Sequence, residues 1–272
     1  MTFTLVTSGN RGIGLAIVKV LSARLSAPSI VIGCRDIISG KKAIQELRTE
    51  GVTVHLDHVE LDIENDDSIR EAVATVSQRY GKLEFLVNNA ARVTQPEPDR
   101  LEDVRRAANE VFNNGITSNE VITRAFLPLL RKSPSPRVIM VLSARGSIGM
   151  TAAREVIASP APALLRPDLA NEDDKLPPAA VVSYCLSKAA LNMLMVHLQR
   201  EQDRRAGKDT AMVEFWAVSP GHCPTTFYRY RGSRDPEDGA EVVARLLEAE
   251  KGEFEAGTFW RWEDGEMKRV KW

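Results

Sequence analysis

Residues 7–14 are the feature that most limits how this chain can fold. They read Thr-Ser-Gly-Asn-Arg-Gly-Ile-Gly and join a short β-type run, 3–6, to a stretch with helical spacing, 13–25. Glycines at such a junction let the backbone turn tightly and approach a pyrophosphate, which then sits on free N–H groups at the helix N-terminus. A glycine loop alone also fits an ordinary strand-to-helix turn, but its place between a strand and a helix favours nucleotide binding.

Strands and helices alternate along the rest of the chain. Segments with helical spacing, such as 41–49 and 66–80, separate the apolar β-type runs. These runs lie at 30–32, 52–61, 85–87, 137–142, 213–218 and 258–262. Such alternation is typical of a parallel sheet with helices on both faces. The sequence therefore predicts an α/β protein built on a single Rossmann-type, doubly wound parallel sheet.

One segment interrupts this rhythm. Residues 151–182 are rich in proline, carry the acidic run 172–174 and show no clear periodicity. This segment is either an inserted loop or a disordered linker. Regular patterning resumes after it, so we interpret it as an insertion, at about 151–182, within one domain that spans residues 1–272.

The charge balance and the cysteines exclude several classes of protein. The formal net charge is -1, from 36 Lys+Arg and 37 Asp+Glu, which argues against a nucleic-acid or anionic-membrane surface. Cys34, Cys185 and Cys223 are far apart and form no CxxC pair, so we expect no disulfide framework and no metal site. No basic leader and no uncharged apolar run of about 18 residues is present, which predicts a cytoplasmic protein without membrane contact.

A second motif places a phenol and an ammonium group on one helical face. Tyr184 is followed four residues later by Lys188. Residues with this spacing are neighbours on a helix surface. Such a pair also occurs by chance, so by itself it only suggests an acid–base site.

Together these motifs resemble the short-chain dehydrogenase/reductase family over nearly the whole chain. The family's glycine loop matches 7–14, except that Ser8 replaces its first glycine. The other matches, in chain order, are Leu61-Asp62-Ile63, Asn88-Asn89-Ala90-Ala91 (with the final glycine replaced), Ser143 with Gly146 and Gly149, Tyr184 with Lys188, and 220–225. Within the family the sequence is similar to the monomeric NADPH-dependent carbonyl reductases, which carry a comparable insertion.

The resemblance implies a site for hydride transfer. Tyr184 would give a proton to the substrate carbonyl oxygen, while Lys188 would favour the phenolate form and bind the nicotinamide ribose. Ser143 would hold and polarise the same oxygen. The family's fourth catalytic group is an asparagine. Counting back without gaps from 125–128 reaches Gly115, so either Asn114 serves after a one-residue shift or the role is vacant.

The resemblance also implies the cofactor. Cys34 stands where NAD-specific members have an acidic residue, and Arg35 and Arg11 suit a ribose 2′-phosphate, so NADP(H) is expected. His222 either contacts the substrate or packs against the backbone. The implied cofactor-binding residues are Ser8, Asn10, Arg11, Ile13, Arg35, Asp62, Ile63, Asn89, Tyr184, Lys188, Pro220, Gly221, Cys223 and Thr225.

The expected function is an NADP(H)-dependent oxidoreductase that reduces a carbonyl of a small organic molecule or oxidises the alcohol. Two alternatives stay open: a non-catalytic NADP(H)-binding regulator on the same fold, and a cofactor-assisted non-redox step in a biosynthetic pathway. The altered Ser8, Ala91 and Gly115 give the regulator some weight. We also expect a monomer, because the insertion precedes the helix of Tyr184, which in oligomeric relatives forms the subunit interface.

Overall fold

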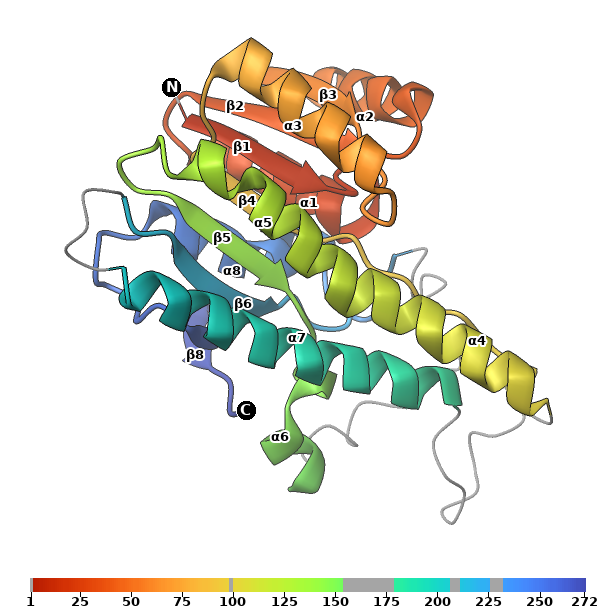
Figure 1. The fold of residues 1–272 in the computed structure, drawn as a ribbon. Helices are drawn as coiled ribbons and strands as arrows, with labels where there is room; N and C mark the ends of the chain where they lie inside the picture. Colours follow the sequence, from red (N-terminus) through yellow and green to blue (C-terminus); the bar gives the residue numbers. More distant parts are fainter. Residues whose placement is uncertain (1, 98–99, 154–178, 206–210, 226–231) are drawn as a thin grey trace.

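One sheet runs through the molecule. The computed structural model describes residues 2–97, 100–153, 179–205, 211–225 and 232–272. Within these, eight strands are ordered β3-β2-β1-β4-β5-β6-β7-β8 (Figure 1). They are β1 (Thr2–Thr7), β2 (Pro28–Cys34), β3 (His55–Glu60), β4 (Phe85–Asn88), β5 (Arg137–Val141), β6 (Glu214–Ser219), β7 (Thr258–Glu263) and β8 (Glu266–Arg269). Neighbouring strands pair in parallel from β3 to β7, and β8 pairs antiparallel with β7.

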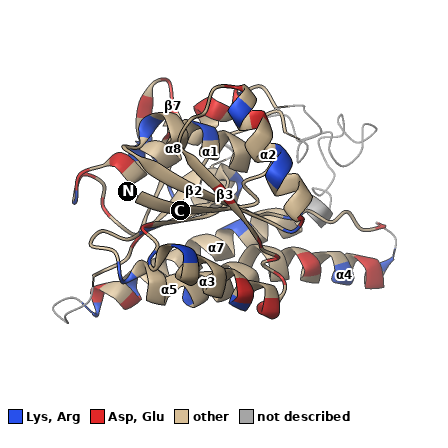
Figure 2. Cartoon of the chain, turned by 90° about the horizontal axis from the view of Figure 1, so that it is seen from above, with Lys and Arg blue, Asp and Glu red and all other residues tan. Residues whose placement is uncertain are grey.

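Helices cover both faces of this sheet. The α-helices are α1 (Gly12–Arg24), α2 (Ile37–Thr49), α3 (Asp66–Tyr80), α4 (Leu101–Phe112), α5 (Ser118–Leu130), α6 (Ile148–Ala152), α7 (Ala179–Asp203) and α8 (Pro236–Glu248). A π-helical turn, η1 (Asn113–Thr117), joins α4 to α5, and a 3-10 turn, η2 (Ala144–Gly146), follows β5. Helices α1, α2 and α8 lie on one face, and α3, α5 and α7 lie on the other (Figure 2).

The alternation of side chains along each strand divides the core in two. Leu5 and Val31 are buried with the residues of α3, α5 and α7, whereas Val6 and Ile32 are buried with those of α1, α2 and α8. Successive residues of a strand point to opposite faces, so a strand that is covered on both sides is apolar throughout. This is why the central strands read as continuous hydrophobic runs.

The strand order creates a crevice at one edge of the sheet. β1 lies between β2 and β4, so the chain leaves β1 toward one side and later returns to the other. In open α/β sheets, ligands bind outside the carboxyl ends of the strands at such a switch point. The glycine loop after β1 and the Asn88-Asn89-Ala90-Ala91 segment after β4 both lie there.

The structure confirms the predicted fold class and changes some boundaries. Helix α2 begins at Ile37 and not near Lys41, because the carboxylate of Asp36 accepts hydrogen bonds from the N–H groups of Ile38 and Ser39 and so caps the helix. The antiparallel strand β8 was not predicted. Of the proposed insertion, Thr151 and Ala152 end α6, and 179–182 begin α7. Residues 154–178 lie outside the described residues.

Helix α7 is long and apolar enough to cross a membrane by length and composition, over Val181–Asp203. In the structure it covers one face of the sheet, and Leu191, Met195 and Leu198 of its inner side are buried in the core. The inner side of this helix is therefore part of the protein core.

Candidate active site

Ser143 is placed by the end of β5. Its Oγ accepts a hydrogen bond from the backbone N–H of Arg145 at 3.3 Å, so the side chain caps the turn η2. The backbone N–H of Ala144, the first residue of η2, donates to Ser219 Oγ at 3.0 Å. This hydrogen bond connects the turn to the end of β6. The serine hydroxyl therefore has a fixed position beyond the carboxyl ends of two adjacent strands.

Lys188 is buried beside this turn. Lys188 is only 3% exposed, and its Nζ donates to the carbonyl oxygen of Val141 at 2.9 Å. Burial lowers the pKa of Lys188 to about 8. Tyr184, also buried, lies one helical turn earlier, with its ring centroid 5.7 Å from the Lys188 Nζ. Residues four apart share a helix face, which explains how both groups reach the same space.

A glycine allows α7 to approach Ser143 so closely. A Cβ atom on Gly146 would lie 2.7 Å from the backbone carbon of Lys188, which is too close for any side chain. The absence of a side chain at this position lets η2 rest directly on the backbone of α7. The glycine three residues after Ser143 thus sets the separation between Ser143 and Lys188.

Ser143, Tyr184 and Lys188 line a common cavity of about 250 Å³. Its wall also includes seven of the other residues that the sequence analysis assigned to the cofactor. These are Ser8, Arg11, Ile13, Asn89, Pro220, Gly221 and Thr225. The remaining lining residues are Gly12, Ala91, Val141 and Leu142, so the described part of the lining contains the basic residues Arg11 and Lys188 and no Asp or Glu.

The glycine loop has an unusual backbone at Ser8. This residue occupies the place of the family's first glycine and has a φ of 52°, in the left-handed region that favours glycine. The residues that follow β4 hold the loop in place. Thr7 Oγ1 accepts hydrogen bonds from the N–H groups of Asn89 and Ala90, both at 2.9 Å. Asn89 Nδ2 in turn donates to the Thr7 carbonyl at 2.9 Å. Asn89 therefore fixes the loop and also lines the cavity.

A second cavity of about 370 Å³ adjoins the first, because Ser8, Arg11 and Ala91 line both. It collects the other predicted cofactor residues, which are Asn10, Arg35, Asp62 and Ile63. The predicted catalytic Asn114 lies here and does not line the cavity of Ser143, Tyr184 and Lys188. The structure brings Cys223 to neither cavity: its thiol is buried near the carbonyls of Pro220 and Asp235, and burial raises its pKa to about 11.

The carboxylates around the second cavity already have partners. Asp36 Oδ2 accepts from Ser39 Oγ at 2.6 Å, and the bonds from Ser39 and Ile38 lower the pKa of Asp36. Asp62 Oδ1 accepts from the N–H of Glu64 at 3.0 Å, and Glu64 Oε2 pairs with Arg92 Nη1 at 3.1 Å. Among the described residues, no carboxylate pairs with Arg11 or Arg35, so both guanidinium groups are available to an anion.

The π-helical turn η1 shapes the wall around Asn114. A π turn takes in one residue more than an α turn and often marks a functional site. Asn119 Nδ2 donates to the backbone carbonyls of Asn114 and Gly115, at 3.0 and 3.2 Å, and so satisfies two carbonyl groups within the irregular turn. Gly115 lets this turn pack on α7, since a Cβ there would lie 3.0 Å from Ser187 Cβ.

Asn114 itself is oriented by Glu64. Its Nδ2 donates to Glu64 Oε1 at 2.8 Å, while its Oδ1 is buried without a hydrogen-bond partner in the described part of the chain. The sequence did not reveal Glu64 or its ion pair with Arg92, because these two residues follow different strands and only the fold brings them together.

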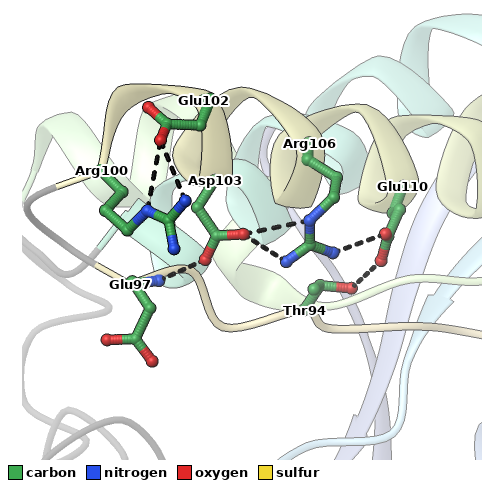
Figure 3. A network of polar contacts seen from close by, with 7 residues as sticks. All are labelled: Thr94, Glu97, Arg100, Glu102, Asp103, Arg106 and Glu110. Carbon is green, nitrogen blue, oxygen red and sulfur yellow. Dashed lines mark hydrogen bonds and ion pairs between the residues drawn. The ribbon is translucent and has the colours of Figure 1, made fainter.

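The loop after β4, which carries Ala91 and Arg92, is anchored to α4 by a polar network (Figure 3). Thr94 Oγ1 donates to Glu110 Oε2 at 3.0 Å, and the backbone N–H of Glu97 donates to Asp103 Oδ2 at 2.6 Å. Arg106 forms ion pairs with both of these carboxylates. Each pair is exposed and individually weak, but together they hold the loop against the helix.

In the described residues, no group of three or more His, Cys, Asp or Glu side chains is placed to hold a metal ion. The fold brings a serine, a tyrosine and a lysine to one cavity, and this cavity adjoins a second one. The fold and the switch-point crevice define a dinucleotide-binding α/β protein.

Comparison with known proteins narrows this class to one family. The family model described as short chain dehydrogenase matches residues 2–158. A short-chain dehydrogenase/reductase of Aspergillus fumigatus is 36% identical over 98% of this chain and 96% of its own length. Carbonyl reductase (NADPH) 3 of Mus musculus is 30% identical, with 89% of each chain covered. The chain belongs to the short-chain dehydrogenase/reductase family, as the sequence motifs predicted, and is an oxidoreductase of that family.

Solved structures show the same fold. The NADPH-bound carbonyl reductase from chicken fatty liver aligns with a TM-score of 0.76 and 24% identity, over 100% of this chain and 99% of that one. Salutaridine reductase from Papaver somniferum aligns with a TM-score of 0.72 and 23% identity, over 95% of this chain and 99% of that one. Both likenesses concern the fold of the chain.

Proposed function

We propose that this protein is an NADPH-dependent reductase that converts a carbonyl group of a small organic molecule to an alcohol, or catalyses the reverse reaction. The observation that carries the proposal is the convergence of Ser143, Tyr184 and the buried Lys188 on one cavity. The relatives named as NADPH carbonyl reductases support the same reading.

The residues of the two cavities fit NADP(H). Arg35 and Arg11 present guanidinium groups without carboxylate partners in the described residues, and Asp36, the nearest acid in sequence, is engaged as the cap of α2. A 2′-phosphate would be held by such groups, and a carboxylate in their place would repel it. Ser8, Asn10 and Ile13 of the glycine loop would hold the pyrophosphate, and Asp62 and Ile63 would contact the adenine.

Each side chain has its own role in the proposed reaction. The nicotinamide ring, when bound, supplies the hydride for the carbonyl carbon. Tyr184 Oη donates a proton to the carbonyl oxygen, and Ser143 Oγ donates a hydrogen bond to the same atom. Lys188, held by the Val141 carbonyl, places a positive charge beside the tyrosine ring and so favours loss of its proton.

We assign Asn114 as the asparagine that completes the catalytic set. Counting back from α5 reaches Gly115, but η1 holds one residue more than an α turn, and this shift moves the position to Asn114. Its buried Oδ1, which has no hydrogen-bond partner among the described residues, supports a polar role. Because Asn114 lines the second cavity, we propose that it acts through the cofactor side of the site and a bound water, without touching the substrate.

We propose a monomeric, cytoplasmic protein whose partner is a small-molecule substrate. Cys34, Cys185 and Cys223 are all free thiols, which supports a reducing compartment. The predicted monomer rests on the segment that precedes α7, most of which lies outside the described residues.

The decisive experiment measures loss of the reduced-nicotinamide absorbance with a panel of aldehydes, ketones and quinones. The proposal requires consumption of NADPH with at least one of them and none with Tyr184→Phe. If NADPH binds and no panel member is reduced, the non-catalytic regulator becomes the better account. Formation of a product without net NADPH consumption would favour the non-redox alternative.

A further inference from the structure

Glu64 is a half-buried carboxylate at which side chains from two other parts of the chain meet. It lies in the segment between β3 and α3. Its Oε1 accepts a hydrogen bond from Asn114 Nδ2 at 2.8 Å, and its Oε2 lies 3.1 Å from Arg92 Nη1. A longer contact, at 3.4 Å, comes from Asn113 Nδ2. Both Glu64 and Asn114 line the second cavity, so this cluster faces the cofactor side of the site.

The carboxylate determines which way the Asn114 amide is turned. An ionised carboxylate can only accept hydrogen bonds, and a guanidinium can only donate them. As the ion-pair partner of Arg92, Glu64 is an acceptor, so Asn114 must present its Nδ2 to it. The Oδ1 atom of Asn114 is thereby directed away from Glu64. The orientation of this amide follows from the charge of its neighbour.

This orientation leaves Asn114 with a buried acceptor. Asn114 is only 6% exposed, and its Oδ1 is buried without a hydrogen-bond partner among the described residues. The backbone carbonyl of Asn114 is already engaged, since Asn119 Nδ2 donates to it at 3.0 Å. Buried acceptors in folded proteins are nearly always satisfied. Because Asn114 lines the second cavity, the group that its Oδ1 fits is a hydroxyl donor on the cofactor side.

We propose that Glu64 is a positioning residue for the reductase: it fixes the Asn114 amide so that Oδ1 accepts a hydrogen bond from a hydroxyl group on the cofactor side of the site. The hydroxyl belongs to a bound water or to a ribose of the cofactor, and these two sources differ in their effect on NADPH affinity. Arg92 completes the arrangement, because its charge keeps the carboxylate an acceptor. This inference rests on the proposed function, since it takes Asn114 as part of the catalytic set.

Glu64→Gln tests the orientation, because it keeps the size of the side chain and reverses its hydrogen-bond pattern. The single oxygen of the new amide pairs with Arg92, so its NH₂ group faces Asn114 and turns the Asn114 amide over. Nδ2 then replaces Oδ1 and cannot accept from the hydroxyl. We expect kcat to fall about tenfold, measured with a carbonyl compound that the wild type reduces. Asn113→Ala, which removes the other amide that contacts Glu64, is the matched control and should keep the wild-type kcat.

A reciprocal substitution separates orientation from packing. In Glu64→Gln/Asn114→Asp, the introduced amide donates to the introduced carboxylate, whose second oxygen restores the acceptor. Asn114→Asp alone places two carboxylates in contact, which is unfavourable. The double variant should therefore have a higher kcat than either single variant, whereas a purely structural role would add the two losses. Thermal unfolding shows that each variant is folded, and if Asn114→Asp does not fold, the comparison of the double variant with Glu64→Gln decides.

NADPH affinity, measured by fluorescence titration, identifies the source of the hydroxyl. An unchanged affinity with a reduced kcat in Glu64→Gln assigns it to water, and a parallel loss of both assigns it to the cofactor ribose. The same kcat in Glu64→Gln as in Asn113→Ala, or a double variant no faster than the single variants, would overturn the inference and leave the reductase intact. A wild type that reduces no carbonyl compound contradicts the proposed function, and this inference with it.

Discussion

The Nζ atom of Lys188 lies 2.9 Å from the carbonyl oxygen of Val141, the last residue of β5. This bond connects α7 to the strand that leads into Ser143. A neutral carbonyl replaces only part of the hydration that the ammonium loses on burial, and this is why the pKa of Lys188 falls to about 8. The lysine that organises the site is therefore held at a cost to folding.

This cost predicts a pH-dependent stability. Below pH 8 the lysine is protonated in both folded and unfolded protein. Between about 8 and its ordinary value of 10.5, the unfolded state binds more protons, so stability rises with pH. Relative to Lys188→Met, the unfolding free energy of the cofactor-free wild type should increase by up to about 3 kcal/mol across this range. Urea denaturation at a series of pH values measures it, and a constant difference would contradict the buried charge.

Tyr184→Phe should abolish turnover and leave NADPH affinity nearly unchanged. The hydroxyl acts on the substrate oxygen in the transition state, whereas the cofactor is bound by the glycine loop and Lys188. Steady-state kinetics and fluorescence titration with NADPH give the two quantities. Activity within about tenfold of the wild type would show that Tyr184 is not the acid.

Arg35→Ala should weaken the preference for NADPH over NADH. The guanidinium would form a charge-assisted contact with the 2′-phosphate, which corresponds to roughly ten- to a hundredfold in affinity. The ratio of kcat/KM for the two cofactors is the measurement. Lys41→Ala, an exposed cation on α2, the helix that follows Arg35, is the control and should leave the ratio unchanged. Equal efficiency with both cofactors in the wild type would refute the charge argument.

Gly146→Ala should be more damaging than Gly115→Ala. The new Cβ at Gly146 would meet the backbone of Lys188 at 2.7 Å, which cannot yield without moving α7, whereas the one at Gly115 would meet the Ser187 side chain at 3.0 Å. Overpacking of this kind costs about 1–3 kcal/mol. We expect Gly146→Ala to lose both stability and kcat, as measured by urea denaturation and steady-state kinetics. Equal effects of the two substitutions would contradict the close packing of η2 on α7.

The protein should be a monomer in dilute solution. The outer side of α7 exposes Leu186 and Met193, and the segment before this helix is long enough in sequence to compete with a second subunit for that surface. Light scattering at micromolar concentration should give a mass near 30.1 kDa. A mass of twice or four times this value would show that α7 is an interface.

The sequence predicted the fold because its strongest signals are local. Apolar runs and helical spacing follow directly from burial on a two-sided sheet, and the glycine loop marks where the first strand meets a helix. Strand β8 was missed because its residues, Glu-Met-Lys-Arg, are mostly charged and give an edge strand no apolar pattern. The start of α2 was missed because Ser39 and Gly40 suggest a turn, whereas the Asp36 cap and the burial of Gly40 favour a helix.

The candidate site was predictable only where each motif is contiguous. Ser143 and the Tyr184–Lys188 pair could be named from spacing, and the structure places them around one cavity. The contact of Glu64 with Arg92 and Asn114 joins three loops and helices that are distant in sequence. Arg145 is half-buried and pairs with no carboxylate of the described residues, and these surroundings also depend on the fold. Neither has a sequence signature.

The π turn between α4 and α5 also bears on how this helix can change during evolution. α4 packs against α7, whereas α5 packs against α3 and the sheet. The continuous helical segment formed by α4, η1 and α5 therefore packs against different elements at its two ends. Removing a single residue from Asn113–Thr117 would restore regular winding and rotate α4 by about 100° relative to α5. The buried side of α4 would then face solvent. A one-residue deletion here would thus be far less tolerated than a substitution, so the length of this stretch is itself a constraint on the sequence.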